Sequence, residues 1–334
     1  MDRPLKRFLI TGGAGFIGSA FIRYGLAQIP QCEKIINLDI LTYAADLRNL
    51  ASVESDPRYL FIQGDIRDEQ LVEELCTQHR VDAIVHFAAE SHVDRSILGP
   101  RAFYETNVGG TLALLEVVRR YPRIHFHHIS TDEVYGTLAA DGAFSEDSPY
   151  RPNSPYSASK AASDHFVRAY HHTYGLSTTI SHCTNNYGPC QNVEKFIPRM
   201  ISGCFHRQPL PVYGKGINVR DWIFVDDHSA AVWAILKNAE SGQVYDIGGE
   251  CERRNIDLLQ SIIQEFAHIK KENTQALQSL ITHIDDRPGH DFRYAIDCSK
   301  IKKQLGWQPS HNISTGLRKT IAWYLENPEK LQLV

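Results

Sequence analysis

The sequence predicts an α/β fold in which a doubly wound parallel sheet is followed by a smaller, mixed α/β part. In the first half of the chain, short apolar runs rich in β-branched residues alternate with longer amphipathic segments. This alternation is typical of parallel strands joined by crossover helices. After about residue 185, loops rich in Asn, Pro and Gly replace it. The length of 334 residues is enough for two domains.

The expected elements follow one another in a regular order. Strands are predicted at 7–11, 34–39, 59–63, 83–87, 123–129 and 177–183, and helices at 19–28, 69–79, 102–120 and 158–174. A further helix is expected at 227–238, returning to the first domain, and residues 255–266 are expected in the smaller domain. We therefore expect a first domain of residues 1–185 with a returning segment near 222–247. Residues 186–221 and 248–334 would form the second domain.

Charge and composition exclude several classes of protein. The formal net charge is −4, whereas a general nucleic-acid binder is normally basic. No run of about 18 apolar residues occurs, and the first residues lead into a predicted strand without the apolar region of a signal peptide. The seven cysteines are scattered without the spacing of a zinc site, so we expect no metal. We expect a soluble, cytoplasmic protein with neither a nucleic-acid nor a membrane partner.

A glycine-rich turn joins the first predicted strand to the first helix. Gly12, Gly15 and Gly18 have the G-x-x-G-x-x-G spacing of a dinucleotide-binding turn, in which the backbone approaches a pyrophosphate at a helix N-terminus. Asp39 ends the second strand, where its carboxylate suits the adenosine ribose hydroxyls and repels a 2′-phosphate. The first domain is thus predicted to be of Rossmann type and to bind NAD. The other expected cofactor contacts are Phe16, Ile17, Asp65, Ile66 and Ala88.

Tyr156 and Lys160 are expected one turn apart on a single helix, just after a proline-rich turn. A tyrosine with a pKa of about 10 is a poor base at neutral pH, but a nearby cation favours the phenolate. Such a pair suits the oxidation of an alcohol. Tyr-x-x-x-Lys alone is equally the pattern of an ordinary amphipathic helix, and the glycine turn upstream is what favours the catalytic interpretation. Polar residues 130–133 follow a buried strand, at the sheet edge where ligands bind.

These motifs together resemble those of the extended short-chain dehydrogenase/reductases that act on nucleotide sugars, and within them the dTDP-glucose 4,6-dehydratases. Thr131-Asp132-Glu133 is the most discriminating of them. The resemblance also implies a homodimer built on helices 102–120 and 158–174. It extends over nearly the whole chain, through residues 12–18, 88–96, 106–111, 130–136, 155–160, 185–189, 210–214, 218–222 and 286–291.

The resemblance implies that dTDP-glucose is converted to dTDP-4-keto-6-deoxyglucose. Tyr156 would act as base while C4 is oxidised by hydride transfer to NAD, and Thr131 would hydrogen-bond the C4 oxygen. The ketone acidifies the C5 hydrogen, which Glu133 would remove while Asp132 protonates the departing C6 hydroxyl. The hydride would then return to C6, so NAD is regenerated in each cycle.

The diphosphate and nucleoside of the substrate need hydrogen-bond donors and cations. Arg220, Arg287 and His290 match family positions that contact them, and Asn186, Lys195 and Asn255 are assigned to the same region. Ser91 and His92 are expected to line the sugar pocket.

The substrate-side segments 190–195 and 248–252 depart from the family pattern. A UDP-sugar dehydratase therefore remains an alternative, as does a 4-epimerase, which needs Tyr156 and NAD but no elimination pair. A non-catalytic NAD-binding regulator is a third interpretation, against which the complete catalytic set argues.

Overall fold

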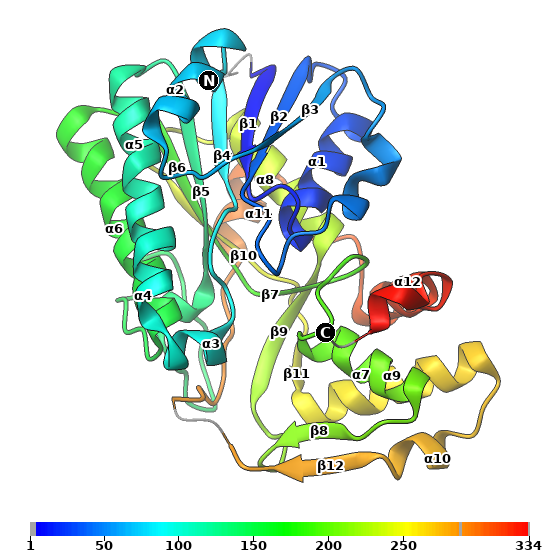
Figure 1. Ribbon diagram of the computed structural model, residues 1–334. Helices are drawn as coiled ribbons and strands as arrows, with labels where there is room; N and C mark the ends of the chain where they lie inside the picture. The colour runs from blue at the N-terminus through cyan, green and yellow to red at the C-terminus, as the bar shows by residue number, and fades with distance from the viewer. Residues whose placement is uncertain (1–4, 287–288, 333–334) are drawn as a thin grey trace.

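The computed structural model describes residues 5–286 and 289–332, so the expected nucleotide contact Arg287 lies outside the described residues. Its larger part is a seven-stranded sheet in the order β10-β6-β5-β4-β1-β2-β3, in which all neighbouring strands are parallel (Figure 1). The strand order changes direction beside β1, between β2 and β4, and ligands bind in open α/β sheets at such a point. The strands are β1 (Arg7–Thr11), β2 (Lys34–Asp39), β3 (Tyr59–Gln63), β4 (Ala83–His86), β5 (His125–Thr131), β6 (Thr178–Cys183) and β10 (Val244–Ile247).

Helices cover both faces of this sheet (Figure 1). On one face, α1 (Phe16–Gln28) and α8 (Val225–Asn238) enclose a core that includes Phe21 and Trp233. On the other face, α2 (Glu69–Gln78), α5 (Thr111–Arg120) and α6 (Pro155–Tyr174) pack over a second core. Except for the edge strand β3, which is only partly buried, the strands are almost entirely buried because both of their faces are covered. Shorter elements follow β2, β4 and β5: η1 (Leu47–Val53), α3 (Val93–Leu98) and η3 (Asp132–Tyr135).

The single helix expected at 102–120 is interrupted. It consists of α4 (Pro100–Phe103), a π-helical segment η2 (Tyr104–Gly110) and α5. The side chain of Asn107, within η2, bonds outside the helix: its Oδ1 accepts from Glu90 N at 2.8 Å and its Nδ2 donates to Ser159 Oγ at 2.8 Å. Gly110 lies so close to Ile66 that a Cβ would come within 2.8 Å of Ile66 Cγ1. These tertiary contacts explain the wider turn, and π-helical turns often lie at functional sites.

The smaller part has a core of its own, between short strands and four helices (Figure 1). The strand β9 (Val219–Phe224) pairs in parallel with β7 (Asn185–Tyr187) and antiparallel with β11 (Glu252–Arg254). A separate parallel pair is formed by β8 (Leu210–Tyr213) and β12 (Ile281–Ile284). The helices are α7 (Phe196–His206), α9 (Asn255–Lys270), α10 (Thr274–Gln278) and α12 (Ile313–Glu326), followed by η4 (Pro328–Leu331). The predicted fold class is thereby confirmed.

The chain returns twice from the smaller part to the large sheet. The first return is through α8 and β10. The second, which the sequence did not lead us to expect, includes α11 (Ser299–Leu305): Ile301 and Trp307 join the core beneath α8, and Lys300 Nζ donates to Val244 O at 2.7 Å. The two parts are therefore held together by several crossings of the chain.

Among the described residues, none of the helices is both long enough and apolar enough to cross a membrane.

Candidate active site

A cavity of about 450 Å³ opens at the carboxyl ends of the central strands and extends toward the smaller part. Its walls come from the glycine turn, from the ends of β2, β4, β5 and β6, from the start of α6 and from the segment before α7. Most of the site residues predicted from the sequence meet here. They are Gly12, Gly15, Phe16, Ile17, Gly18, Asp39, Asp65, Ile66, Ala88, Ser91, Thr131, Asp132, Glu133, Tyr156, Lys160, Asn186 and Lys195.

The glycine turn has the shape that a dinucleotide requires. Gly12 has φ +70°, and a Cβ on it would lie 2.6 Å from Ala88 Cα. A Cβ on Gly18 would lie 2.9 Å from Gly13 Cα and closer still to Gly12 O. The helix α1 begins at Phe16 without a side-chain cap, so its first N–H groups are left for a ligand. An uncapped helix N-terminus next to a tight glycine turn fits a pyrophosphate.

Asp39 lies where the adenosine ribose of a dinucleotide is expected. Its Oδ2 accepts from Ala14 N at 2.9 Å and its Oδ1 from Leu41 N at 2.8 Å. Burial raises the pKa of this carboxyl, and the two backbone hydrogen bonds oppose that rise. Each oxygen keeps a second lone pair for a hydroxyl donor. Asp65 is held by Arg67, whose Nη2 donates to Asp65 Oδ2 at 2.6 Å.

Thr131 and Asp132 lie at the junction of β5 and η3. The backbone N–H of Glu133 donates to Thr131 Oγ1 at 3.3 Å, and Thr131 Oγ1 donates to Asp132 Oδ1 at 3.3 Å. Asp132 is 1 % exposed. Burial raises the pKa of Asp132 well above its usual range, as do the nearby carboxylates of Glu133 and Asp221. This rise in pKa favours the neutral carboxylic acid, which is the form that a proton donor needs.

Tyr156 stands in the first turn of α6, which begins with a capping box. Ser154 Oγ accepts from Ser157 N at 3.0 Å, and Ser154 N donates to Ser157 Oγ at 3.1 Å. Burial raises the pKa of the Tyr156 phenol well above 10, with a further contribution from Glu133, while a hydrogen bond with Thr131 opposes the rise. This direction is opposite to the lowering that we expected from a nearby cation, because burial and the carboxylate of Glu133 determine it. The ammonium of Lys160 donates to Ile129 O.

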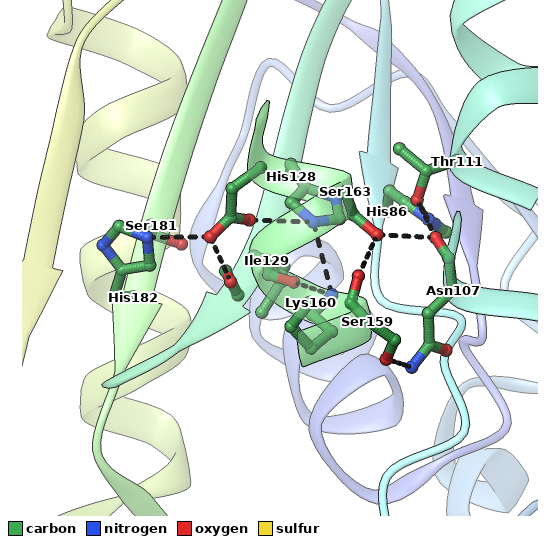
Figure 2. Close-up of polar contacts among 12 residues, drawn as sticks. His86, Asn107, Thr111, His128, Ile129, Ser159, Lys160, Ser163, Ser181 and His182 are labelled. Atoms are coloured by element: carbon green, nitrogen blue, oxygen red, sulfur yellow. Dashed lines mark hydrogen bonds and ion pairs between the residues drawn. The ribbon is translucent and has the colours of Figure 1, made fainter. Parts of the chain in front are cut away.

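Lys160 lines the cavity, although only 4 % of it is exposed. Its Nζ donates to Ile129 O at 2.7 Å and lies 3.3 Å from His128 Nε2 (Figure 2). Burial lowers the pKa of this ammonium to about 8, and the carboxylate of Asp164 opposes that fall. The position of Lys160 is thus set by its contacts with β5.

The predicted substrate residues divide into two groups. Lys195 and Asn186 line the cavity: Lys195 Nζ donates to Ser91 O at 3.1 Å, whereas Asn186 Oδ1 is buried with no hydrogen-bond partner. His92, Arg220, Asn255 and His290 are not in its walls. The guanidinium of Arg220 donates to Asp291 O at 2.9 Å and packs 4.3 Å from the centre of the Tyr294 ring.

Sequence reasoning missed several residues that line the cavity or act on it. Cys183, at the end of β6, lines the cavity, although we counted it only among scattered thiols. Its position at the end of a predicted strand was the available signal. Asp221, which raises the pKa of Asp132, lies in the segment 218–222 that carries the resemblance, but it was not assigned a role. Its proximity to Asp132 could not be read locally, because it comes from β9 of the smaller part. No cluster of three or more metal-ligating side chains was found within 5–286 and 289–332.

Comparison with known proteins agrees with this geometry. Residues 9–320 match the family described as GDP-mannose 4,6 dehydratase. A dTDP-glucose 4,6-dehydratase from Xanthomonas campestris pv. campestris is 50 % identical over 338 residues, covering 98 % of this chain and 95 % of that protein.

Solved structures show the same likeness. The dTDP-glucose 4,6-dehydratase DesIV from Streptomyces venezuelae, with NAD and TYD bound, is similar with a TM-score of 0.92 and 45 % identity, covering 98 % of this chain and all of that one. The dTDP-glucose 4,6-dehydratase from Bacillus anthracis, in complex with NAD, has a TM-score of 0.89 and 41 % identity over the same shares. The chain therefore belongs to the nucleotide-sugar 4,6-dehydratases of the short-chain dehydrogenase/reductase family.

Proposed function

We propose that this protein is an NAD-dependent dTDP-glucose 4,6-dehydratase, a hydro-lyase that forms dTDP-4-keto-6-deoxyglucose. The observation that carries the proposal is the adjacent pair Asp132 and Glu133, with Asp132 buried, in one cavity with Tyr156. Burial raises the pKa of Asp132, as an acid in elimination requires. A 4-epimerase needs Tyr156 and NAD, but it has no use for an elimination pair. The names of the similar proteins support dTDP-glucose as the substrate.

The glycine turn and Asp39 would hold NAD, at its pyrophosphate and its adenosine ribose. Bound there, NAD supplies the hydride acceptor for C4 oxidation, a positive charge beside the phenol of Tyr156, and the hydride that returns to C6. Tyr156 takes the proton of the C4 hydroxyl. Thr131, whose hydroxyl lies beside Asp132, hydrogen-bonds the C4 oxygen as its charge develops.

Elimination requires an acid and a base that act together. Glu133 removes the C5 proton as a carboxylate, and Asp132 donates its proton to the departing C6 oxygen, which leaves as water. A well-placed acid or base contributes a factor of about 10² to 10⁴ in rate. Glu133 then returns a proton to C5 as C6 is reduced.

The proton count of the cycle balances only if Asp132 is protonated again after each turnover. Tyr156 gains the proton of the C4 hydroxyl, while Asp132 loses one to the leaving water. Thr131 bonds Asp132 Oδ1 at 3.3 Å, and a hydrogen bond links Thr131 with Tyr156. We assign Thr131 as the path along which the proton moves from the phenol to the carboxylate.

We assign residues 1–185, with the return near 222–247, to NAD binding, and 186–221 with 248–334 to the nucleotide sugar. In the cavity wall, Asn186 offers an unpartnered oxygen to a sugar hydroxyl, and Lys195 suits the diphosphate. Ser91 is assigned to the sugar. Substrate contacts by His92, Arg220, Asn255, Arg287 and His290 remain predictions.

We also propose that the protein is a cytoplasmic homodimer, joined through residues 102–120, which belong to α4, η2 and α5, and residues 158–174 of α6. Exposed apolar side chains on these helices support this assignment: Tyr104 is 65 % exposed, Tyr174 51 % and Phe166 36 %. Light scattering in solution should give twice the mass of the chain. A monomeric mass would contradict the proposal.

Mass spectrometry of the protein incubated with single nucleotide sugars tests the function. With dTDP-glucose and NAD, we expect the loss of one water per substrate. Loss of water from UDP-glucose alone would show that the protein is a dehydratase with a different substrate from the one proposed. No change of mass with any nucleotide sugar would contradict the dehydratase, and chromatography of the same samples would then reveal a 4-epimer.

A further inference from the structure

A row of polar side chains extends from Lys160 past His128 toward His182 (Figure 2). His128 Nε2, 3.3 Å from Lys160 Nζ, also lies 3.3 Å from Asp164 Oδ1. Asp164 Oδ2 lies 3.1 Å from His182 Nε2, and His182 Nδ1 lies 3.1 Å from Asp246 Oδ1. These five side chains come from α6, β5, β6 and β10, and none is more than 4 % exposed. The row therefore reaches across three strands entirely inside the protein.

Burial and the hydrogen bonds between neighbours decide which groups of the row are charged. Burial opposes ionisation of Asp164, but hydrogen bonds from His128 and His182 lower its pKa well below the usual range. Burial likewise opposes a charge on His182, but hydrogen bonds to Asp164 and Asp246 raise its pKa to about 9. Burial and the ammonium of Lys160 lower the pKa of His128 to about 4. At neutral pH the row therefore has a cationic Lys160, a neutral His128, an anionic Asp164 and a cationic His182.

We propose that Asp164 and His182 are positioning residues for Lys160: Asp164, on the far side of the His128 ring, stabilises the ammonium that Ile129 O holds in place, and His182 moderates the charge of Asp164. Together they set the pH range over which Lys160 stays charged. The inference rests on the proposed function, because it takes Lys160 as the cation of the oxidation step. A buried ammonium without a nearby carboxylate loses its proton readily, and Asp164 is the carboxylate on the same helix face, one turn after Lys160. His182 in turn neutralises part of the charge of Asp164.

The neighbours of Lys160 explain why Asp164 matters. Among the groups that act on the pKa of Lys160, Asp164 is the first to oppose the effect of burial, ahead of the thiol of Cys183. The remaining titratable neighbours are neutral or cationic. They are His128 from β5, His86 from β4, whose ring centre lies 5.3 Å from that of His128, and His182 from β6.

Two substitutions should therefore move the pH dependence of oxidation in opposite directions. Asp164→Asn removes the carboxylate, so Lys160 loses its proton at a lower pH. His182→Asn removes a cation and leaves the charge of Asp164 less neutralised, so Lys160 keeps its proton to a higher pH. A purely structural role would not produce shifts of opposite sign.

The experiment isolates oxidation in a Glu133→Gln background, where reduced NAD should accumulate because elimination is blocked. The rate of NAD reduction on mixing with dTDP-glucose is measured against pH. We expect the alkaline limb to move down by about one pH unit or more in Asp164→Asn and to move up in His182→Asn. The inference would be overturned if the alkaline limbs of the two variants stay in place or move in the same direction.

Asp227→Asn is the matched control. Asp227 is another buried carboxylate paired with a histidine, 3.0 Å from His311 Nδ1, but it lies on α8. Its substitution should lower the melting temperature and leave the alkaline limb in place. If Asp164→Asn does not fold, His182→Asn decides the question alone. Absence of NAD reduction in the Glu133→Gln parent would overturn the proposed function, and the inference with it, whereas normal reduction with unmoved limbs would overturn only the inference.

Discussion

Burial favours the protonated, neutral forms of both Asp132 and Tyr156, and each side chain must exchange its proton during a turnover. Burial raises the pKa of each group well above its usual range, and the carboxylate of Glu133 adds to both effects. Asp132 can therefore donate a proton, whereas the phenol of Tyr156 keeps its proton. The phenol therefore needs the positive charge that NAD brings, so oxidation should depend on bound cofactor rather than on Lys160 alone.

Tyr156→Phe should abolish NAD reduction when dTDP-glucose is added, because the base that takes the C4 proton is removed. We expect a loss of about 10² to 10⁴ in the rate of oxidation, followed by the absorbance of reduced NAD. Equilibrium binding of NAD should change little and serves as the control. A variant that still reduces NAD at the original rate would exclude Tyr156 as the base.

The sequence predicted which residues form this site better than it predicted their protonation and orientation. Thr131, Asp132 and Glu133 follow a strand, and Tyr156 and Lys160 lie one turn apart on a helix, so local patterns brought them together. The protonation of Asp132 also depends on Asp221, which lies on a strand of the other part. The direction of the Lys160 ammonium depends on Ile129 O, across the sheet face. Neither contact can be predicted from the local periodicity of the sequence.

At the element scale, the turn before α1 requires glycine at position 18, because the backbone of Gly12 and Gly13 lies too close to leave room for a side chain. Gly18→Ala would place a methyl group 2.9 Å from Gly13 Cα and closer to Gly12 O, and such overpacking typically costs about 1 to 3 kcal/mol. Because the strain falls on the pyrophosphate turn, we expect NAD affinity to fall by about tenfold or more, measured by titration calorimetry.

Gly109→Ala provides the comparison within another helical segment. The nearest atom to its added methyl group would be Tyr104 O at 3.9 Å, which is an ordinary contact. NAD affinity should be unchanged in this variant. Equal losses of affinity in the two variants would contradict the role of the close approach at Gly18.

Helices and strands governed by local periodicity were predicted well, and those shaped by distant contacts were not. The strands at 7–11, 34–39 and 59–63 have the predicted bounds. The helix expected at 102–120 contains a π-helical turn, because Asn107 bonds Glu90 and Ser159. The second return of the chain through α11 depends on the packing of Trp307 beneath α8, which no local pattern shows.

At the scale of the whole molecule, NAD binding should stabilise the fold, because the cofactor cavity is built from segments far apart in the chain. At about 100 times its dissociation constant, a ligand that binds only the folded state adds about 2.7 kcal/mol. Removal of NAD should therefore lower the melting temperature in differential scanning fluorimetry. NADP at the same concentration should give a smaller effect, because Asp39 repels its 2′-phosphate. An equal effect of NADP would contradict that role of Asp39.

The internal return of the hydride is tested most directly with dTDP-glucose that carries deuterium at C4. The site as assigned oxidises C4 and reduces C6 within one binding event, so the product should keep the deuterium and have it at C6, as measured by NMR and mass spectrometry. Product without deuterium would show that reduced NAD exchanges with solution. Deuterium remaining at C4 would show that C4 is not oxidised and would contradict the proposed dehydratase.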